Sequence, residues 1–408
     1  MMVSKSLSII LAIVYSLFSV SLSGEDIGLP PSLTMRSIAL VLLTICFCIV
    51  VMYEKDINLS LNKYINFLLL TLLLIISWIL LSYLFSSNQK LVSIADIFAW
   101  ITIPFCILLV FKISKYLLWK YFVYTIIIFQ FFTILMIIMW TFINTGDITN
   151  SLIVREFIDE NITIGLNRLL NGIALLNIFS ISIVLGFYNS SKIIYILSFF
   201  NLICTFFLSF TSGSRQSVLA ILSALFIIIL INRYLRSSKG INYKSILFIF
   251  LFVFLVINVL QKEEIQTWID DRFIAKTTEQ LETGDKRTDI YELAIADLKD
   301  ELLFGTGPGT YHKVSLIGLH THNGYLYMAN NFGVFSVILI LLSFIFIIVN
   351  SLRKKTNIVA NKKQDIFVTT FTTMLVFIFI MNMFNDLTTT LSFWMAVVLV
   401  IDSYSVRT

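Results

Sequence analysis

The chain has 408 residues, of which 58% are hydrophobic and 13% charged, and its formal net charge is +5. Its mean hydropathy is +0.92. A soluble domain is roughly half apolar and about a quarter charged, so this composition excludes a soluble globular protein and indicates an integral membrane protein. The positive charge does not indicate nucleic-acid binding, because the lysines and arginines lie mostly in short segments between apolar runs.

Apolar stretches near the roughly 20 residues needed to cross a bilayer recur along the whole chain. We expect an all-α polytopic protein with about twelve spans. The expected spans are residues 7–23, 37–53, 65–85, 91–111, 121–143, 168–187, 193–211, 216–232, 245–261, 325–349, 366–385 and 388–402. The first span has some features of a signal peptide, but with eleven spans behind it we expect an uncleaved helix.

Basic residues collect in three segments between spans, and positively charged loops stay in the cytoplasm. These residues are Lys112, Lys115, Lys120, Arg233, Arg236, Lys239, Lys244, Arg353, Lys354, Lys355, Lys362 and Lys363. With twelve spans, these three segments and both termini share the cytoplasmic side. The far side then holds residues 144–167, 211–215, 262–324 and 385–390.

Residues 262–324 form a polar island in this apolar chain. The island contains half of the 24 acidic residues and all three histidines, His312, His320 and His322. We therefore expect the chemistry in this external loop. The chain then divides into spans one to nine over 1–261, the catalytic loop over 262–324, and spans ten to twelve over 325–408.

Residues 289–302 of the island have the spacing of an amphipathic helix, with Asp285 and Thr288 as candidate N-caps. Its apolar side would hold Ile290, Leu293, Ala294, Leu298 and Leu302. The stretch Gly305-Thr306-Gly307-Pro308-Gly309 should end this helix in turns. It is not a nucleotide-binding loop, because no Lys-Ser/Thr pair follows and no strand precedes it.

Arg215 follows a turn of small hydroxyl residues between two apolar spans. An arginine at a membrane boundary can be an interfacial anchor. Here its small neighbours leave the guanidinium accessible. The planar set of N–H donors on a guanidinium suits a phosphate or diphosphate. Lys286 and Arg287 open the loop helix, where an anion would also meet free N–H groups and the positive helix end. A solvated helix start is the alternative there.

His320 and His322 lie just before span ten. A zinc site needs a third ligand and usually a carboxylate at suitable spacing; only His312 remains and no carboxylate adjoins the pair, so no metal site is expected. A histidine at the membrane surface can instead take a proton from a hydroxyl or orient it. A polar loop histidine without a catalytic role is the alternative.

The four cysteines lie inside apolar spans and are expected to be small buried residues. Cys46 and Cys48 are close in sequence, but they point to different sides of a helix. The cysteines therefore indicate no metal site.

In their order along the chain, these motifs resemble the O-antigen ligase and polymerase family. The matching elements are Ser214-Arg215 before a span, Lys286-Arg287 opening a helix that leads to Leu303-Phe304-Gly305-Thr306-Gly307, and His320-x-His322-Asn323 with Gly333 ten residues later. The resemblance covers roughly residues 165–390. It departs at Ser336, where the family often has Gly, Thr or Tyr.

The resemblance implies a glycosyltransferase of the GT-C type that uses an undecaprenyl-diphosphate-linked glycan as donor, without nucleotide sugar, required metal or other cofactor. Arg215 and Arg287 would hold the donor diphosphate. His322 would orient or deprotonate the acceptor hydroxyl, with inversion at the anomeric carbon. Further candidate substrate contacts are His320, Asn323, Lys286, Arg168 with Asn171, and Asp386; anchoring or capping is the alternative for Arg168 and Asp386.

Two activities of the family differ in their acceptor: a polymerase extends a lipid-linked repeat unit of O-antigen or capsule, and a ligase transfers the finished chain to lipid A-core. We favour the polymerase, the more numerous branch. A lipid-linked oligosaccharide flippase is the alternative from another class. Transport predicts charges near the membrane midplane and two related halves, and the sequence shows neither, because its charged residues cluster outside the expected spans. The expected location is the bacterial inner membrane, with the active loop facing the periplasm or cell exterior. Membrane lipid and a chain-length regulator are the expected partners, and no nucleic acid.

Overall fold

In the computed structural model, all regular structure among the described residues is helical. The described residues are 2–20, 35–54, 63–86, 88–92, 94–114, 116–145, 170, 172–178, 180, 192–211, 217–223, 225, 286–315, 323–353, 394–395 and 397–399. The helices are α1 (Met2–Val20), α2 (Met35–Glu54), α3 (Lys63–Phe85), the 3₁₀ turn η2 (Gln89–Leu91), α4 (Ile94–Ser114), α5 (Trp119–Thr145), α8 (Lys192–Thr211), α13 (Lys286–Asp300), α14 (Tyr311–Val314), α15 (Gly324–Phe332) and α16 (Val334–Arg353).

Four described helices are long and apolar enough to cross a membrane. They contain the windows Ile65–Phe85, Ile97–Ser114, Trp119–Met139 and Lys192–Ser209. Shorter apolar helices cover Ser4–Ser19, Ile38–Met52 and Val334–Ser343. Because a helix satisfies its own backbone hydrogen bonds in lipid, these helices make the chain a polytopic membrane protein. The count of twelve spans and the GT-C architecture stay predictions.

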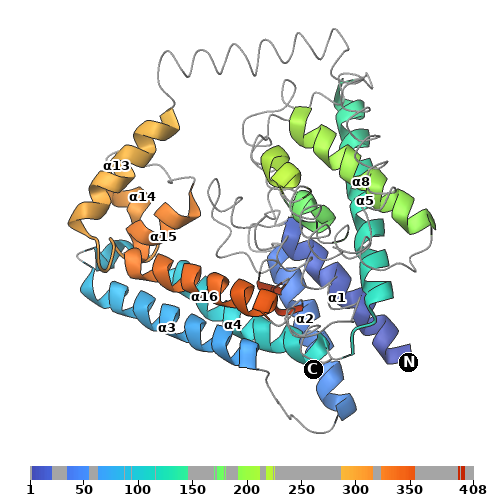
Figure 1. Ribbon diagram of the computed structural model, residues 1–408, viewed down its shortest axis with the longest axis horizontal. Coiled ribbons are helices and arrows are strands. Elements are labelled where there is room, and N and C mark those ends of the chain that lie inside the picture. The colour runs from blue at the N-terminus through green and yellow to red at the C-terminus, as the bar shows by residue number, and fades with distance from the viewer. Residues whose placement is uncertain are drawn as a thin grey trace.

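The helices form two connected groups (Figure 1). In one group, α1 packs against α2 and α5, and α5 packs against α8. In the other, α3 lies between α4 and α16, with α13, α14 and α15 gathered at one end of these long helices. Contacts between α2 and α4 join the groups.

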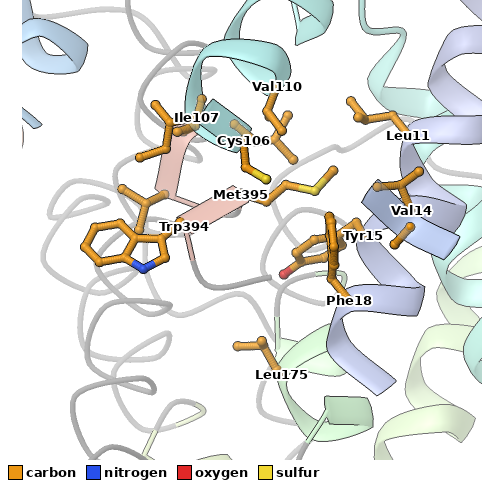
Figure 2. Packing of buried hydrophobic residues seen from close by; sticks show 14 of the residues in the cluster. Leu11, Val14, Tyr15, Phe18, Cys106, Ile107, Val110, Leu175, Trp394 and Met395 are labelled. Atoms are coloured by element: carbon orange, nitrogen blue, oxygen red, sulfur yellow. The ribbon is translucent and has the colours of Figure 1, made fainter. Parts of the chain in front are cut away.

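A buried cluster near α1 brings distant parts of the sequence together (Figure 2). Leu11, Val14, Tyr15 and Phe18 of α1 lie near Ile107 of α4 in this cluster. The same view also contains Cys106, Val110, Leu175, Trp394 and Met395. The first, middle and last parts of the chain therefore share one core.

Three details differ from the sequence-based expectations. Lys112 is not in a loop: it lies in the last turn of α4 and is 1% exposed. Cys46 is buried as predicted and Cys48 is exposed, because residues two apart point to different sides of a helix. The expected single span 325–349 is two helices that meet at Gly333.

Candidate active site

Helices α13 and α15 pack side by side and both end close to α3 (Figure 1). The N–H of Val334, directly after α15 and Gly333, donates to the carbonyl of Leu302, just after α13, at 3.0 Å. Since the two helices lie together and end together, they also start on the same side, away from α3. By length they extend about 22 Å and about 13 Å, at 1.5 Å per residue.

The expected loop helix is present, but it starts three residues earlier than predicted. Lys286 and Arg287 form the first turn of α13, and the helix ends at Asp300. On its predicted apolar side Ala294 is fully buried, whereas Leu302 lies beyond the helix end and is 57% exposed. Two residues of the predicted diphosphate site thus occupy a helix N-terminus, where the backbone favours negative charge.

Asn323 is the N-cap of α15. Its side-chain oxygen accepts hydrogen bonds from the N–H groups of Tyr325 and Leu326, at 2.9 and 3.1 Å. The first N–H groups of a helix have no partner within it, and asparagine is a preferred residue for satisfying them. The residue after His322 therefore fixes where α15 begins.

The predicted turn-rich stretch after α13 is confirmed, and it packs tightly against the end of α15. Gly305 and Gly333 have φ values of 65° and 81°, which favour glycine. A Cβ on Gly333 would lie 1.8 Å from the carbonyl oxygen of Leu303, and one on Gly305 would lie 2.7 Å from that of Asn330. Backbone meets backbone here, so a side chain has no space at either position.

The last four carbonyl groups of α15, which a helix leaves without internal partners, all accept hydrogen bonds. Their donors are the N–H of Gly333 to Ala329 at 2.8 Å, the N–H of Thr306 to Asn330 at 2.7 Å, the N–H of Gly307 to Asn331 at 3.0 Å, and the indole of Trp78 to Phe332 at 2.9 Å. The hydroxyl of Ser82 adds a second bond to Asn331, at 3.1 Å. The end of α15 is thus fixed by the turn before α14 and by α3.

Tyr311 connects α14 to both neighbouring helices. Its N–H donates to the side-chain oxygen of Asn331 at 3.1 Å, and its hydroxyl donates to Asp297 of α13 at 3.1 Å. Burial, followed by the hydrogen bond to Asp297 and the charge of that carboxylate, raises the pKa of Tyr311 above its ordinary value. The phenol therefore stays protonated at neutral pH and keeps its donor role.

Several predicted site residues lie outside the described part of the chain. They are Arg168, Asn171, Arg215, His320, His322 and Asp386. Among the described residues, no group of three or more His, Cys, Asp or Glu side chains is arranged to hold a metal ion. The structure therefore brings together the helices that carry Lys286, Arg287 and Asn323, and the roles of all predicted site residues stay proposals.

The comparison with known families bears directly on this region. Residues 200–341 match a family model described as O-antigen ligase. This part of the chain is similar to the O-antigen ligase family. The match confirms the resemblance to O-antigen ligases and polymerases, and it includes most of α8, all of α13, α14 and α15, and the first part of α16. No curated protein matches the chain.

The O-antigen ligase domain supports an enzyme of ligase or polymerase type that acts on lipid-linked polysaccharide. Its matched region does not include α3, although α3 supplies side-chain donors to the end of α15. The sequence-based reading missed these donors. The available signal was the four-residue spacing of Trp78, Ser82 and Ser86 at the end of a mostly apolar run.

Proposed function

We propose that the protein is an inverting GT-C glycosyltransferase of the bacterial inner membrane, with an undecaprenyl-diphosphate-linked glycan as donor and polymerisation of O-antigen or capsule repeat units as its reaction. The observation that carries the proposal is the O-antigen ligase match over residues 200–341. The common orientation of α13 and α15 supports it, because the two helices begin on the same side. The first turn of α13 holds Lys286 and Arg287, and the N-cap of α15 directly follows His322 in the sequence. Two helix N-termini on one side favour an anionic ligand.

In the proposed reaction, Arg215 and Arg287 bind the donor diphosphate and stabilise the negative charge that grows on it. The bond between the anomeric carbon and the diphosphate oxygen breaks, and a bond from that carbon to the acceptor oxygen forms on the opposite face. His322 accepts the proton of the acceptor hydroxyl. Undecaprenyl diphosphate leaves with the electron pair of the broken bond.

The other predicted contacts have supporting roles in this proposal. Lys286 adds positive charge beside Arg287, and His320 contacts the acceptor. Arg168 and Asp386 lie in segments predicted on the same side and contribute to substrate binding there. Asn323 acts first as the cap of α15, which holds the chain next to His322.

Purified protein with lipid-linked repeat units tests the role of His322. We expect His322→Ala to lose turnover by a factor of order 10²–10⁴, the usual contribution of a general base, while donor binding persists. Activity should survive EDTA and fall below neutral pH, because imidazolium cannot accept a proton. Loss on chelation with recovery on adding zinc would instead assign a metal to the histidine pair.

The acceptor is tested in a deletion strain by its lipopolysaccharide profile. Lipid A-core that carries a single repeat unit is the result expected for a polymerase. Bare core together with accumulated lipid-linked polymer would assign the ligase reaction, in which the finished chain goes to lipid A-core. A chain-length regulator as partner of the polymerase would show as loss of the modal length when that regulator is removed.

A further inference from the structure

Three hydrogen-bond donors lie along one side at the end of α3, and Ser86 directly follows its last residue, Phe85. Trp78, Ser82 and Ser86 are four residues apart, and residues at this spacing lie on the same side of a helix. All three donate to backbone carbonyls of the O-antigen ligase domain rather than to side chains. We propose that these three residues are positioning residues for the transfer reaction and fix α15, and with it the chain at His322, through the helix end.

The acceptors show which part of the domain is held. Trp78 donates to the carbonyl of Phe332, and the single O–H of Ser82 is shared between the carbonyls of Phe304 and Asn331. Ser86 bonds to the carbonyl of Thr306. The donors therefore span the junction between the turn after α13 and the last turn of α15.

Ring contacts strengthen the same junction. Phe304 stacks against Trp78 at a centroid distance of 5.1 Å and against Phe85 at 4.9 Å. Trp78 also packs against Phe335 of α16, at 4.6 Å. Such aromatic pairs add stabilisation beyond the burial of their area, so α3 holds this junction by both polar and apolar contacts.

The burial of these groups makes each donor important. Ser82 is 0% exposed and Ser86 is 6% exposed. If the Ser82 hydroxyl is removed, the carbonyl of Phe304 loses this donor and that of Asn331 keeps only the N–H of Gly307, so the turn after α13 is held less firmly against the end of α15. The turn after α13 supplies N–H donors to the carbonyls of Asn330 and Asn331. In the described residues it supplies no N–H donor to the carbonyl of Phe332, which accepts from Trp78.

A shift at the end of α15 reaches its start, because its nine residues form one rigid helix of about two and a half turns, about 13 Å long. A tilt of about 10° at the Phe332 end moves the Asn323 end by about 2 Å. Displacements of about 1 Å at reacting groups lower rates by as much as 10²-fold. The donors of α3 therefore affect turnover by fixing the tilt of α15 and so the position of its first turn. This inference rests on the proposed role of His322.

The test uses the full-length protein in lipid nanodiscs with lipid-linked repeat units. We expect Ser82→Ala and Trp78→Phe each to lower kcat about 10-fold or more, with the donor KM within about twofold of wild type. Ser82→Thr, which keeps the hydroxyl, should recover most of the rate, and Ser82→Val, of the same shape as threonine, should not. Thr71→Ala is the matched control, because the Thr71 hydroxyl bonds within α3 to the carbonyl of Phe67.

A second readout does not depend on activity. Nitroxide labels at Tyr325 and Lys90, in a background without native cysteines, report the distance from the start of α15 to the turn after α3. The distance distribution should broaden when Ser82→Ala and Trp78→Phe are combined, and it should stay narrow in Thr71→Ala. Unchanged distances together with wild-type kcat in the Ser82 and Trp78 variants would overturn the inference. An inactive wild type, or a fully active His322→Ala, would instead count against the proposed function, while the label distances still decide the positioning role.

Discussion

Asn323 and Asn331 lie at the two ends of α15, and each uses its side-chain oxygen for a backbone N–H. Asn323 accepts from the first turn of α15, and Asn331 accepts from Tyr311 of α14. The amide of Asn331 also donates to the carbonyl of Tyr327, at 2.8 Å. Both side chains are therefore used in hydrogen bonds to the backbone, and these bonds hold the two ends of α15 in place.

Replacement of Asn323 separates capping from substrate binding. Asn323→Ala removes the acceptor for two N–H groups and should lower the free energy of unfolding by about 1 kcal/mol. Asn323→Ser keeps a capping oxygen and should retain both stability and most of the turnover. The measurements are thermal unfolding and turnover with lipid-linked repeat units. Full stability but no turnover in the serine variant would show that the amide itself contacts substrate.

The two arginines of the proposed diphosphate site should respond alike. Arg215→Ala and Arg287→Ala are each expected to abolish polymer or reduce it at least tenfold, at normal protein levels. Arg→Lys should rescue only in part, since an ammonium cannot reproduce two parallel hydrogen bonds. Polymer is measured on gels and protein by immunoblot. Full activity in either lysine variant would identify that arginine as a membrane anchor.

At the scale of elements, the break between α15 and α16 departs most clearly from the expected helices. Residues 325–349 are apolar enough for one span, but the chain turns at Gly333, where the backbone of Leu303 approaches. The break ends α15 and exposes its last carbonyls to α3 and to the turn after α13. Ser336, where the sequence departs from the family, bonds through its hydroxyl to the carbonyl of Gly333 at 2.7 Å and so serves this break.

Gly333→Ala should disrupt the junction. The backbone conformation at φ 81° costs a non-glycine residue about 1–3 kcal/mol, and the added Cβ would also collide with the carbonyl of Leu303. We expect a lower unfolding temperature and loss of turnover. Leu342→Ala on α16 is the control, because Leu342 is 56% exposed and should leave both unchanged. A Gly333→Ala protein with wild-type stability would contradict the described geometry.

At the scale of the whole molecule, contacts between residues far apart in the sequence show what lies at each end of α4. Beside the start of α1, Ser8 accepts a hydrogen bond from the N–H of Leu118 at 2.8 Å, and Lys5 lies 4.9 Å from the ring centre of Tyr121. At the other end of α4, Lys313 donates to the carbonyl of Leu91 at 2.8 Å. Since α4 is about 31 Å long, the turn before it and the segment after α13 lie together, away from the N-terminus.

Cysteine labelling tests the corresponding membrane topology. In a background without the four native cysteines, Gln89→Cys and Ser315→Cys should react with an impermeant maleimide from the periplasmic side. Asn357→Cys, in a basic segment, should react only after the membrane is opened, because positively charged loops stay in the cytoplasm. Reaction of Ser315→Cys and Asn357→Cys from the same side would refute the twelve-span arrangement.

The sequence by itself determined the membrane class, the helical content, a helix within residues 286–302, the turns at residues 305–309 and the resemblance to O-antigen ligases that the match over residues 200–341 confirms. These follow from composition, from the length of apolar runs and from local turn chemistry, which act over a few residues. It did not reveal which face of α3 is buried. Leu70, Leu73 and Leu74 are exposed and Leu68, Leu72 and Ile75 are buried, but lipid is as apolar as the protein core, so both faces have the same composition.

Only the tertiary structure decided that Gly333 divides a span, that Asn323 caps a helix, and that Trp78 and Ser82 serve carbonyls about 250 residues away. Residues 325–349 contain no proline, and their helix-end signal, Asn330, Asn331 and Gly333, lies inside an apolar run that is long enough for one span. The break depends instead on backbone groups of the loop after α13, which reach α15 only when the chain is folded. Local patterns therefore gave the elements, and contacts between distant backbone groups set the junction that supports the proposed site.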